Sequence, residues 1–106
     1  MHVQIVDFQL KDISEEQYRA LCDELAPNWS ELPGLLAKVW LANGPSGTYG
    51  GVYLWESRQA FETYKASELF RAVAAHTHLK GVTSRDFAVL EDPTQVTWKL
   101  GVAVPV

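Results

Sequence analysis

A pair of apolar segments joined by a turn-rich loop constrains the fold more than any other feature of this sequence. The first, LLAKVWLA at residues 35–42, and the second, GGVYLWES at residues 50–57, have the length and the aliphatic and aromatic content of β-strands. The segment between them, NGPSGTY, is dense in Gly, Pro, Asn and Ser, which favour turns. The pattern predicts a β-hairpin near the middle of the chain.

One helical pattern precedes this hairpin and another follows it. Ser14 is followed three residues later by Gln17, which is a capping-box pattern, and apolar residues then recur at helical spacing. We expect this first helix to end or kink at Pro27. The second helix is predicted from Ser57, which is suited to be its N-cap, with a break at Ser67.

The outermost segments add two further strands. Residues 2–10, HVQIVDFQL, are rich in β-branched and aromatic side chains, and residues 82–92, VTSRDFAVLED, predict a strand that ends at Pro93. The order strand, helix, strand, strand, helix, strand predicts an α+β fold of the ferredoxin-like type, a split βαβ antiparallel sheet with two helices on one face. We expect a single domain over residues 1–106, in which residues 94–106 form an extended C-terminal tail.

Composition excludes several classes of function. The net charge of -4 comes from scattered residues without a basic block, which argues against a nucleic-acid partner. No apolar run is long enough to cross a bilayer, and the start MHVQIVDF lacks a secretory signal pattern, so we expect no membrane association and a cytoplasmic location. Cys22 is the only cysteine, and no cluster has zinc-ligand spacing, so no metal is expected.

The alternation of the central strands leaves open which sheet face the helices cover. We expect small and branched residues such as Ala37 and Val39 to lie against the helices, because they suit close packing. The opposite face would then be too apolar for water. It would carry Val6, Phe8, Leu36, Lys38, Trp40, Tyr53, Trp55, Phe87 and Val89. The alternative is that the aromatic side chains face the helices and that Leu35, Val39, Val52 and Leu54 lie on the open face.

Four segments carry a likeness to a known family. PGLLAKVW, GGVYLWES, a helix with AFETY and VTSRDFAVLEDPT resemble the YdhR-type mono-oxygenases of the dimeric α/β-barrel superfamily, which includes the antibiotic biosynthesis monooxygenases. The likeness covers about residues 3–97. It implies a homodimer whose two sheets close into a barrel, with a hydrophobic pocket either between sheet and helices or at the barrel interior. It also implies that some relatives oxidise phenolic or quinol-like molecules with molecular oxygen and no metal or flavin.

Cofactor-free oxygenation requires a base or cation, orientation and a dry pocket. Lys38 is a candidate because a partly desolvated lysine has a depressed pKa and can also stabilise a phenolate. Trp40 and Tyr53 could stack on a flat ring and bond its oxygens, and His76 is a candidate proton acceptor. The structural alternatives are that Lys38 reaches solvent, that the aromatic side chains fill a dimer core and that His76 is a solvated residue near a helix end.

A second group of residues is expected to bind substrate around the four catalytic candidates. Its members are apolar or aromatic, with one further cation: Leu36, Trp55, Tyr49, Arg85 and Phe87. In haem-degrading relatives the resemblance would place the axial histidine near Ala74, and His76 is displaced from that register by about half a turn, which counts against haem. We therefore expect no cofactor, with molecular oxygen as co-substrate.

The leading hypothesis is a cofactor-independent monooxygenase that acts on a small aromatic or polyketide-like substrate as a homodimer. One alternative is an isomerase, cyclase or lyase that uses acid-base groups of the same pocket. The other is a non-catalytic dimeric protein that binds an apolar ligand.

Overall fold

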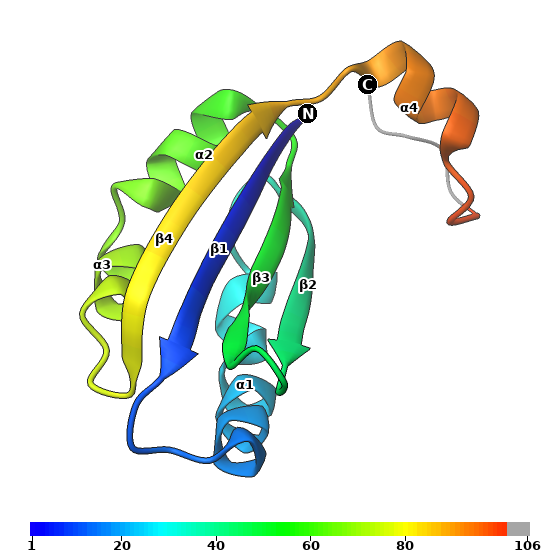
Figure 1. The fold of residues 1–106 in the computed structure, drawn as a ribbon. Helices are drawn as coiled ribbons and strands as arrows, with labels where there is room; N and C mark the ends of the chain where they lie inside the picture. The colour runs from blue at the N-terminus through cyan, green and yellow to red at the C-terminus, as the bar shows by residue number, and fades with distance from the viewer. Residues whose placement is uncertain (102–106) are drawn as a thin grey trace.

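The computed structural model describes residues 1–101, which form a four-stranded antiparallel sheet with helices on one face (Figure 1). The strand order β2-β3-β1-β4 places the first and third strands at the centre. This confirms the predicted α+β ferredoxin-like fold. The elements are β1 (His2–Leu10), α1 (Glu15–Ser30), β2 (Leu35–Asn43), β3 (Thr48–Trp55), α2 (Arg58–Lys65), α3 (Glu68–Ala74), β4 (Leu79–Ala88) and α4 (Glu91–Thr97).

Helix α1 starts as the sequence predicts and continues through Pro27. The Ser14 side chain accepts a hydrogen bond from the Gln17 backbone, and the Gln17 side chain accepts one from the Ser14 backbone, so the capping box is complete. The helix runs on to Ser30, so Pro27 does not end it. Trp29, which is 5% exposed, packs edge-on to Trp40, and burial of this large ring offsets the hydrogen bond that Pro27 cannot donate.

The second helical segment is divided at Ser67, as predicted. Ser57 caps α2 by accepting a hydrogen bond from the backbone of Ala60, and Ser67 caps α3 by accepting one from Phe70. The division lets the two short helices follow the twisted sheet, α2 against β1 and β3 and α3 against β4.

The C-terminal part differs from the expectation of a strand to residue 92 and an extended tail. Strand β4 ends at Ala88 and helix α4 begins at Glu91. Pro93 lies in the first turn of this helix, where a missing N–H costs little, and Glu91 and Asp92 complement the helix dipole. Helix α4 stands apart from the layer of α1, α2 and α3 (Figure 1). Residues 102–106 of the expected tail lie outside the described residues.

The preferred assignment of the sheet faces is wrong. The alternative is correct for the aromatic residues and for Val39, but Leu35 packs against the core beside an irregularity of β2. The register pairs Lys38 with Tyr53 and Tyr53 with Gln4, so these residues share a face, and this face lies under the helices. Tyr53 and Trp55 are 2% and 0% exposed there. The expectation failed because helices that diverge over a twisted sheet leave a wide gap, which large rings fill better than small branched side chains.

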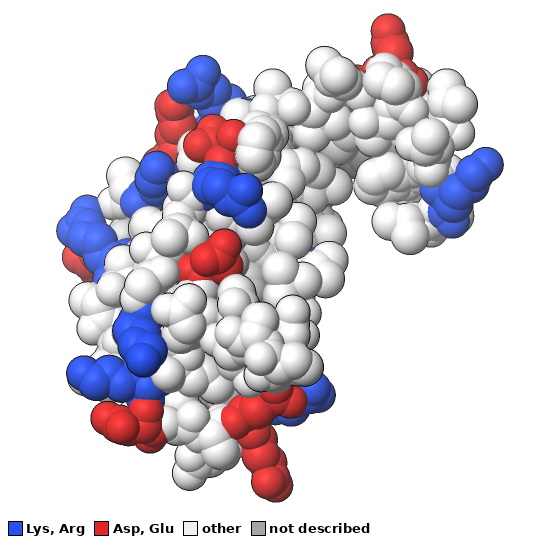
Figure 2. Space-filling view, in the orientation of Figure 1, with Lys and Arg blue, Asp and Glu red and all other residues white. Residues whose placement is uncertain are grey.

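The opposite face carries paired branched aliphatic residues and is open. Val39 pairs with Val52, which pairs with Ile5, and Val39 is 56% exposed. White, uncharged side chains cover most of the area over β1, β3 and β2 (Figure 2). An apolar face of this kind is typical of a protein interface. None of the helices in residues 1–101 is both long and apolar enough to cross a membrane.

Candidate active site

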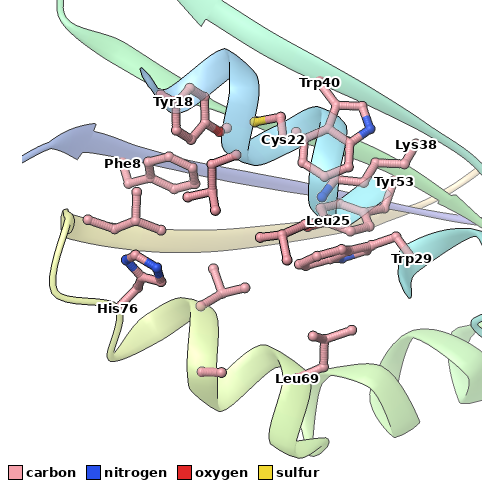
Figure 3. A pocket seen from close by; sticks show the side chains of 16 residues that line it. Phe8, Tyr18, Cys22, Leu25, Trp29, Lys38, Trp40, Tyr53, Leu69 and His76 are labelled. Carbon is pink, nitrogen blue, oxygen red and sulfur yellow. The ribbon is translucent and has the colours of Figure 1, made fainter. Parts of the chain in front are cut away.

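A cavity of about 280 Å³ lies between the sheet and the helices, with α1 on one side and α3 on the other (Figure 3). Its wall is mostly aliphatic and aromatic. The polar groups at the wall are the amine of Lys38, the thiol of Cys22, the imidazole of His76 and the hydroxyls of Tyr18 and Tyr53. Apolar pockets with a few convergent polar groups are the usual form of small-molecule sites.

Two adjacent glycines of β3 make room for this cavity. A Cβ at Gly50 would overlap the carbonyl oxygen of Val6, so only glycine allows β1 to approach here. A Cβ at Gly51 would lie 3.0 Å from Cε of Lys38, so its absence leaves space for the lysine stem. The Gly-Gly pair of GGVYLW therefore shapes the floor of the cavity and admits Lys38.

The amine of Lys38 lies among three aromatic rings. Its Nζ is 3.4 Å from the ring centroid of Trp40, 4.0 Å from that of Trp29 and 4.7 Å from that of Tyr53 (Figure 3). No hydrogen bond or ion pair found within residues 1–101 involves this amine. The rings supply the electron-rich faces that attract a cation, but no carboxylate accompanies them.

The protonation of Lys38 is shifted by this environment. Burial lowers the pKa of Lys38 to about 7, and the neighbouring Cys22 thiol opposes the shift. The facing rings also favour the charged form, by about 1–2 kcal/mol. The neutral amine is therefore accessible near neutral pH, where an exposed lysine is almost wholly protonated.

A row of hydroxyl groups extends from the rings into the core. Nε1 of Trp29 donates to the Tyr64 hydroxyl at 3.2 Å, and the hydroxyls of Tyr64 and Tyr53 are 3.4 Å apart. Burial raises the pKa of both tyrosines, so they stay protonated. Burial raises the pKa of Tyr18 as well. The hydroxyls at the wall act as neutral donors, not as bases.

His76 stands at the opposite end of the cavity from Lys38 (Figure 3). Its Nδ1 accepts a hydrogen bond of 3.1 Å from the backbone of His78. A neutral His76 therefore carries its proton on Nε2, as a donor.

A second hollow adjoins the cavity between α1 and the edge strand β2. It has a volume of about 490 Å³ and shares Tyr18, Cys22 and Trp40 with the cavity. Its other lining residues include Arg19 and Asp23, so it is more polar. A ligand can approach the cavity from this side past Trp40.

A family of mono-oxygenases, described as "Putative mono-oxygenase ydhR", matches residues 3–99 of the chain. The chain belongs to the YdhR family. The family resemblance carried by PGLLAKVW and GGVYLWES is thereby confirmed. No protein of curated function matches this YdhR-family chain.

Solved structures show the same fold at low sequence identity. The haem degrader MhuD from Mycobacterium tuberculosis, with two haems in its active site, is 22% identical, with 87% of this chain and 98% of that chain covered and a TM-score of 0.69. SnoaB from Streptomyces nogalater, a cofactor-independent oxygenase, is 17% identical, with 85% and 94% covered and a TM-score of 0.65. A protein from Deinococcus radiodurans described as a putative antibiotic biosynthesis monooxygenase is 14% identical, with 84% and 92% covered and a TM-score of 0.68.

The structure brings the four residues predicted as catalytic to one cavity. Lys38, Trp40, Tyr53 and His76 all line it, although three of them reach it from the sheet face that the sequence did not favour. Whether they act in catalysis remains a prediction.

The five residues predicted to bind substrate do not line this cavity. Trp55 is fully buried and donates to Oε1 of Gln4 at 3.1 Å, and the Tyr49 hydroxyl donates to Glu15. Arg85 and Phe87 point to the open sheet face because they pair with Ile5 and Val3, and Leu36 is exposed at an irregularity of β2. Alternation within β4 does not fix its phase relative to β2, so Arg85 and Phe87 were wrongly grouped with Lys38. Trp55 and Tyr49 do share the face of Tyr53 but lie outside the cavity.

Several lining residues were not predicted as site residues. Tyr18, Cys22, Leu25 and Trp29 of α1 form one wall, and Leu69 and Val73 of α3 form the other. Their helical spacing is visible in the sequence, but a stripe that packs on a sheet and one that borders a cavity have the same periodicity.

The cavity is small compared with a porphyrin. Its volume of about 280 Å³ lies near the lower end of the range of about 300–1,000 Å³ typical of ligand pockets, and Lys38 is the one lysine or arginine among the described residues at its wall. A porphyrin with two propionates would require more space and more positive charge than this cavity alone offers. Within residues 1–101, no cluster of His, Cys, Asp and Glu side chains could hold a metal ion.

Proposed function

We propose that this cavity is the active site of an oxygenase that oxidises a small aromatic or polyketide-like phenol with molecular oxygen and without a metal or flavin. The observation that carries the proposal is the unpaired, desolvated amine of Lys38 at the wall of an aromatic-lined cavity. Membership of a mono-oxygenase family supports the class of reaction.

The proposed reaction balances with oxygen as the oxidant. A phenol loses its hydroxyl proton to a base, and the phenolate transfers an electron to oxygen. The ring carbon and the reduced oxygen then combine to a peroxide. Loss of water leaves a new carbonyl group, so one oxygen atom enters the product and the other leaves as water. For 1-naphthol the products are 1,4-naphthoquinone and one water molecule.

Lys38 supplies the base and then the compensating charge. Its neutral amine accepts the phenolic proton, and the resulting ammonium stabilises the phenolate and the reduced oxygen species in a medium of low dielectric constant. Trp29 and Trp40 supply faces on which a flat ring can stack. Tyr53 and His76 can donate hydrogen bonds to substrate oxygens at the two ends of the cavity.

The proposal includes a homodimer in which the open sheet faces of two subunits cover each other. The exposed Val39 and Phe87 support it, because an apolar sheet face without a cover is unfavourable in water. The cavity itself lies within one subunit, so the dimer would support the sheet that forms the cavity floor.

The test is oxygen consumption with a panel of hydroxylated two- and three-ring aromatics that starts with 1-naphthol. We expect turnover that stops under nitrogen, and one ¹⁸O atom in the quinone from ¹⁸O₂. Turnover that persists without oxygen would instead favour the isomerase, cyclase or lyase alternative, and no turnover with any member would contradict the proposal.

Variants of Lys38 separate the two roles of the amine. Lys38→Met should lower kcat/KM by about 10²-fold or more, while Lys80→Met, at an exposed position, serves as the matched control and should leave it unchanged. Lys38→Arg keeps the cation but cannot act as a base. Partial activity of Lys38→Arg would show that charge, not proton transfer, is the larger contribution.

In the wild type, kcat/KM should rise as the pH increases through about 7, because the neutral amine then forms.

A further inference from the structure

Lys38 differs from every other lysine of this chain. The remaining lysines, at positions 11, 65, 80 and 99, are exposed. Lys38 reaches the apolar cavity and is only partly exposed, and its amine has no hydrogen-bond or ion-pair partner among residues 1–101. A partly desolvated amine without a partner is a potential nucleophile as well as a base.

We propose that Lys38 forms a covalent imine with flat aromatic aldehydes and ketones that enter the cavity. The Nζ lone pair attacks the carbonyl carbon, and a carbinolamine forms. Its hydroxyl group leaves with one proton as water, and a carbon-nitrogen double bond replaces the carbonyl. Nothing is oxidised or reduced, and no reactant other than the carbonyl compound is required.

The ring cluster around the amine suits the product of this reaction. A protonated imine is a cation at the position of Nζ, and Trp40, Trp29 and Tyr53 present their faces to that position at 3.4–4.7 Å. Among the described residues no carboxylate lines the cavity, and none of them forms an ion pair that would hold the amine in its unreactive protonated form.

Four other titratable groups line the same cavity. From α1 these are the Tyr18 hydroxyl and the Cys22 thiol, from β3 the Tyr53 hydroxyl, and beyond α3 the imidazole of His76. Burial raises the pKa of both tyrosines and of Cys22, so these groups are neutral at pH 7 and can give a proton to the departing hydroxyl. Cys22 can also add to an aldehyde, but a hydride donor does not reduce that adduct to a stable product.

The lowered pKa of Lys38 supports selectivity over the exposed lysines. With a pKa of about 7, roughly half of Lys38 is neutral at pH 7. An exposed lysine is neutral in only about one molecule in 10³ at that pH. Lys38 is therefore expected to react at least about 100-fold faster than any exposed lysine.

This reaction does not depend on the proposed oxygenase function. Imine formation requires no oxygen, and an oxygenase in which Lys38 acts only as a base would not form it with a phenol. An experiment under nitrogen with a carbonyl probe therefore tests this inference alone.

The probe is 2-naphthaldehyde with sodium cyanoborohydride, which reduces a protonated imine to a stable secondary amine. Full-length protein is treated at pH 7 under nitrogen and then measured by intact mass and peptide mapping. We expect a single adduct, heavier by the aldehyde less one oxygen atom, on the peptide that contains Lys38. Naphthalene, which has the same rings but no carbonyl, should slow the labelling.

Variants provide the matched controls. Lys38→Met should lose the adduct while its circular dichroism spectrum is retained, and Lys80→Met should be labelled like the wild type. Label spread over the exposed lysines, label on another residue, or labelling unaffected by naphthalene would overturn the inference. Because peptide mapping of the wild type identifies the labelled lysine directly, the result stands even if Lys38→Met fails to fold.

Discussion

The two faces of the sheet differ in the kind of side chain that they carry. Under the helices, Tyr53 and Trp55 are 2% and 0% exposed, and they stack with their ring planes nearly parallel. On the open face, Val39 and Phe87 are 56% and 50% exposed. Tyr53 thus borders the cavity within the subunit and Trp55 fills the core beside it, whereas Val39 and Phe87 belong to an apolar surface that no described residue covers.

Two polar side chains in one row of the covered face show what this difference means for function. Gln4 and Lys38 both pair with Tyr53, from either side. Both polar atoms of the Gln4 amide have a partner in the core, because Oε1 accepts from Trp55 and Nε2 donates to Ser84. Three rings face the amine of Lys38, which has no hydrogen-bond or ion-pair partner among residues 1–101. A satisfied buried polar group stabilises the fold, whereas an unsatisfied one at a cavity indicates a site.

The first prediction compares truncations on the two faces. Trp55→Ala should lower the free energy of unfolding by about 3–5 kcal/mol, because it opens a cavity and leaves Oε1 of Gln4 without its donor. Val39→Ala should cost less than about 1 kcal/mol in the isolated subunit, since the side chain is half exposed. Urea unfolding at submicromolar protein concentration measures both. Equal losses would mean that the two faces do not differ in the isolated subunit.

The second prediction asks whether the open face is covered by another copy of the chain. Val39→Asp should raise the dissociation constant of the homodimer by about 100-fold or more, because a carboxylate would be buried without a partner. Light scattering and sedimentation over a concentration series measure the change. Thr63→Asp adds the same charge at an exposed position of α2 and should leave association unchanged. A wild type that is monomeric at micromolar concentration would remove the basis for the dimer.

Element order and helix starts could be predicted from the sequence because they depend on local signals. The turn-rich loop before β3 and the capping serines at 14, 57 and 67 act within a few residues of themselves. Helix α4 was missed because its first turn contains Pro93, which has opposite meanings at the start and in the middle of a helix.

The candidate site could be predicted only in part, because the phase of a strand depends on what packs against it. Alternation shows that Lys38 and Trp40 share a face, and the family resemblance drew attention to them. Alternation does not show which face the helices cover when both are apolar. Nor does alternation fix the phase of one strand relative to another, so Arg85 and Phe87 were grouped with Lys38, although they point the other way.

The third prediction uses pH to distinguish Lys38 from the satisfied polar groups of the same face. The pKa of Lys38 is about 7 in the folded chain and about 10.4 in the unfolded chain. Between these values the unfolded state binds more protons, so this residue makes the free energy of unfolding rise with pH. Below pH 7 the folded chain carries a partly desolvated ammonium, which lowers the free energy of unfolding of the wild type. Lys38→Met removes this ammonium and its cost.

Relative to the wild type, Lys38→Met should therefore be most stable at pH 6. This advantage in the free energy of unfolding should decrease by about 2 kcal/mol between pH 6 and pH 9. Each pH unit between the two pKa values contributes about 1.4 kcal/mol, and the attraction of the rings for the ammonium reduces the total. Urea unfolding of both proteins from pH 6 to pH 9 measures this difference. Lys80→Met, in which an exposed ammonium is lost, should show a flat difference over the same range. A flat difference for Lys38→Met as well would show that the amine is not desolvated, and would weaken its role both as a base and as a nucleophile.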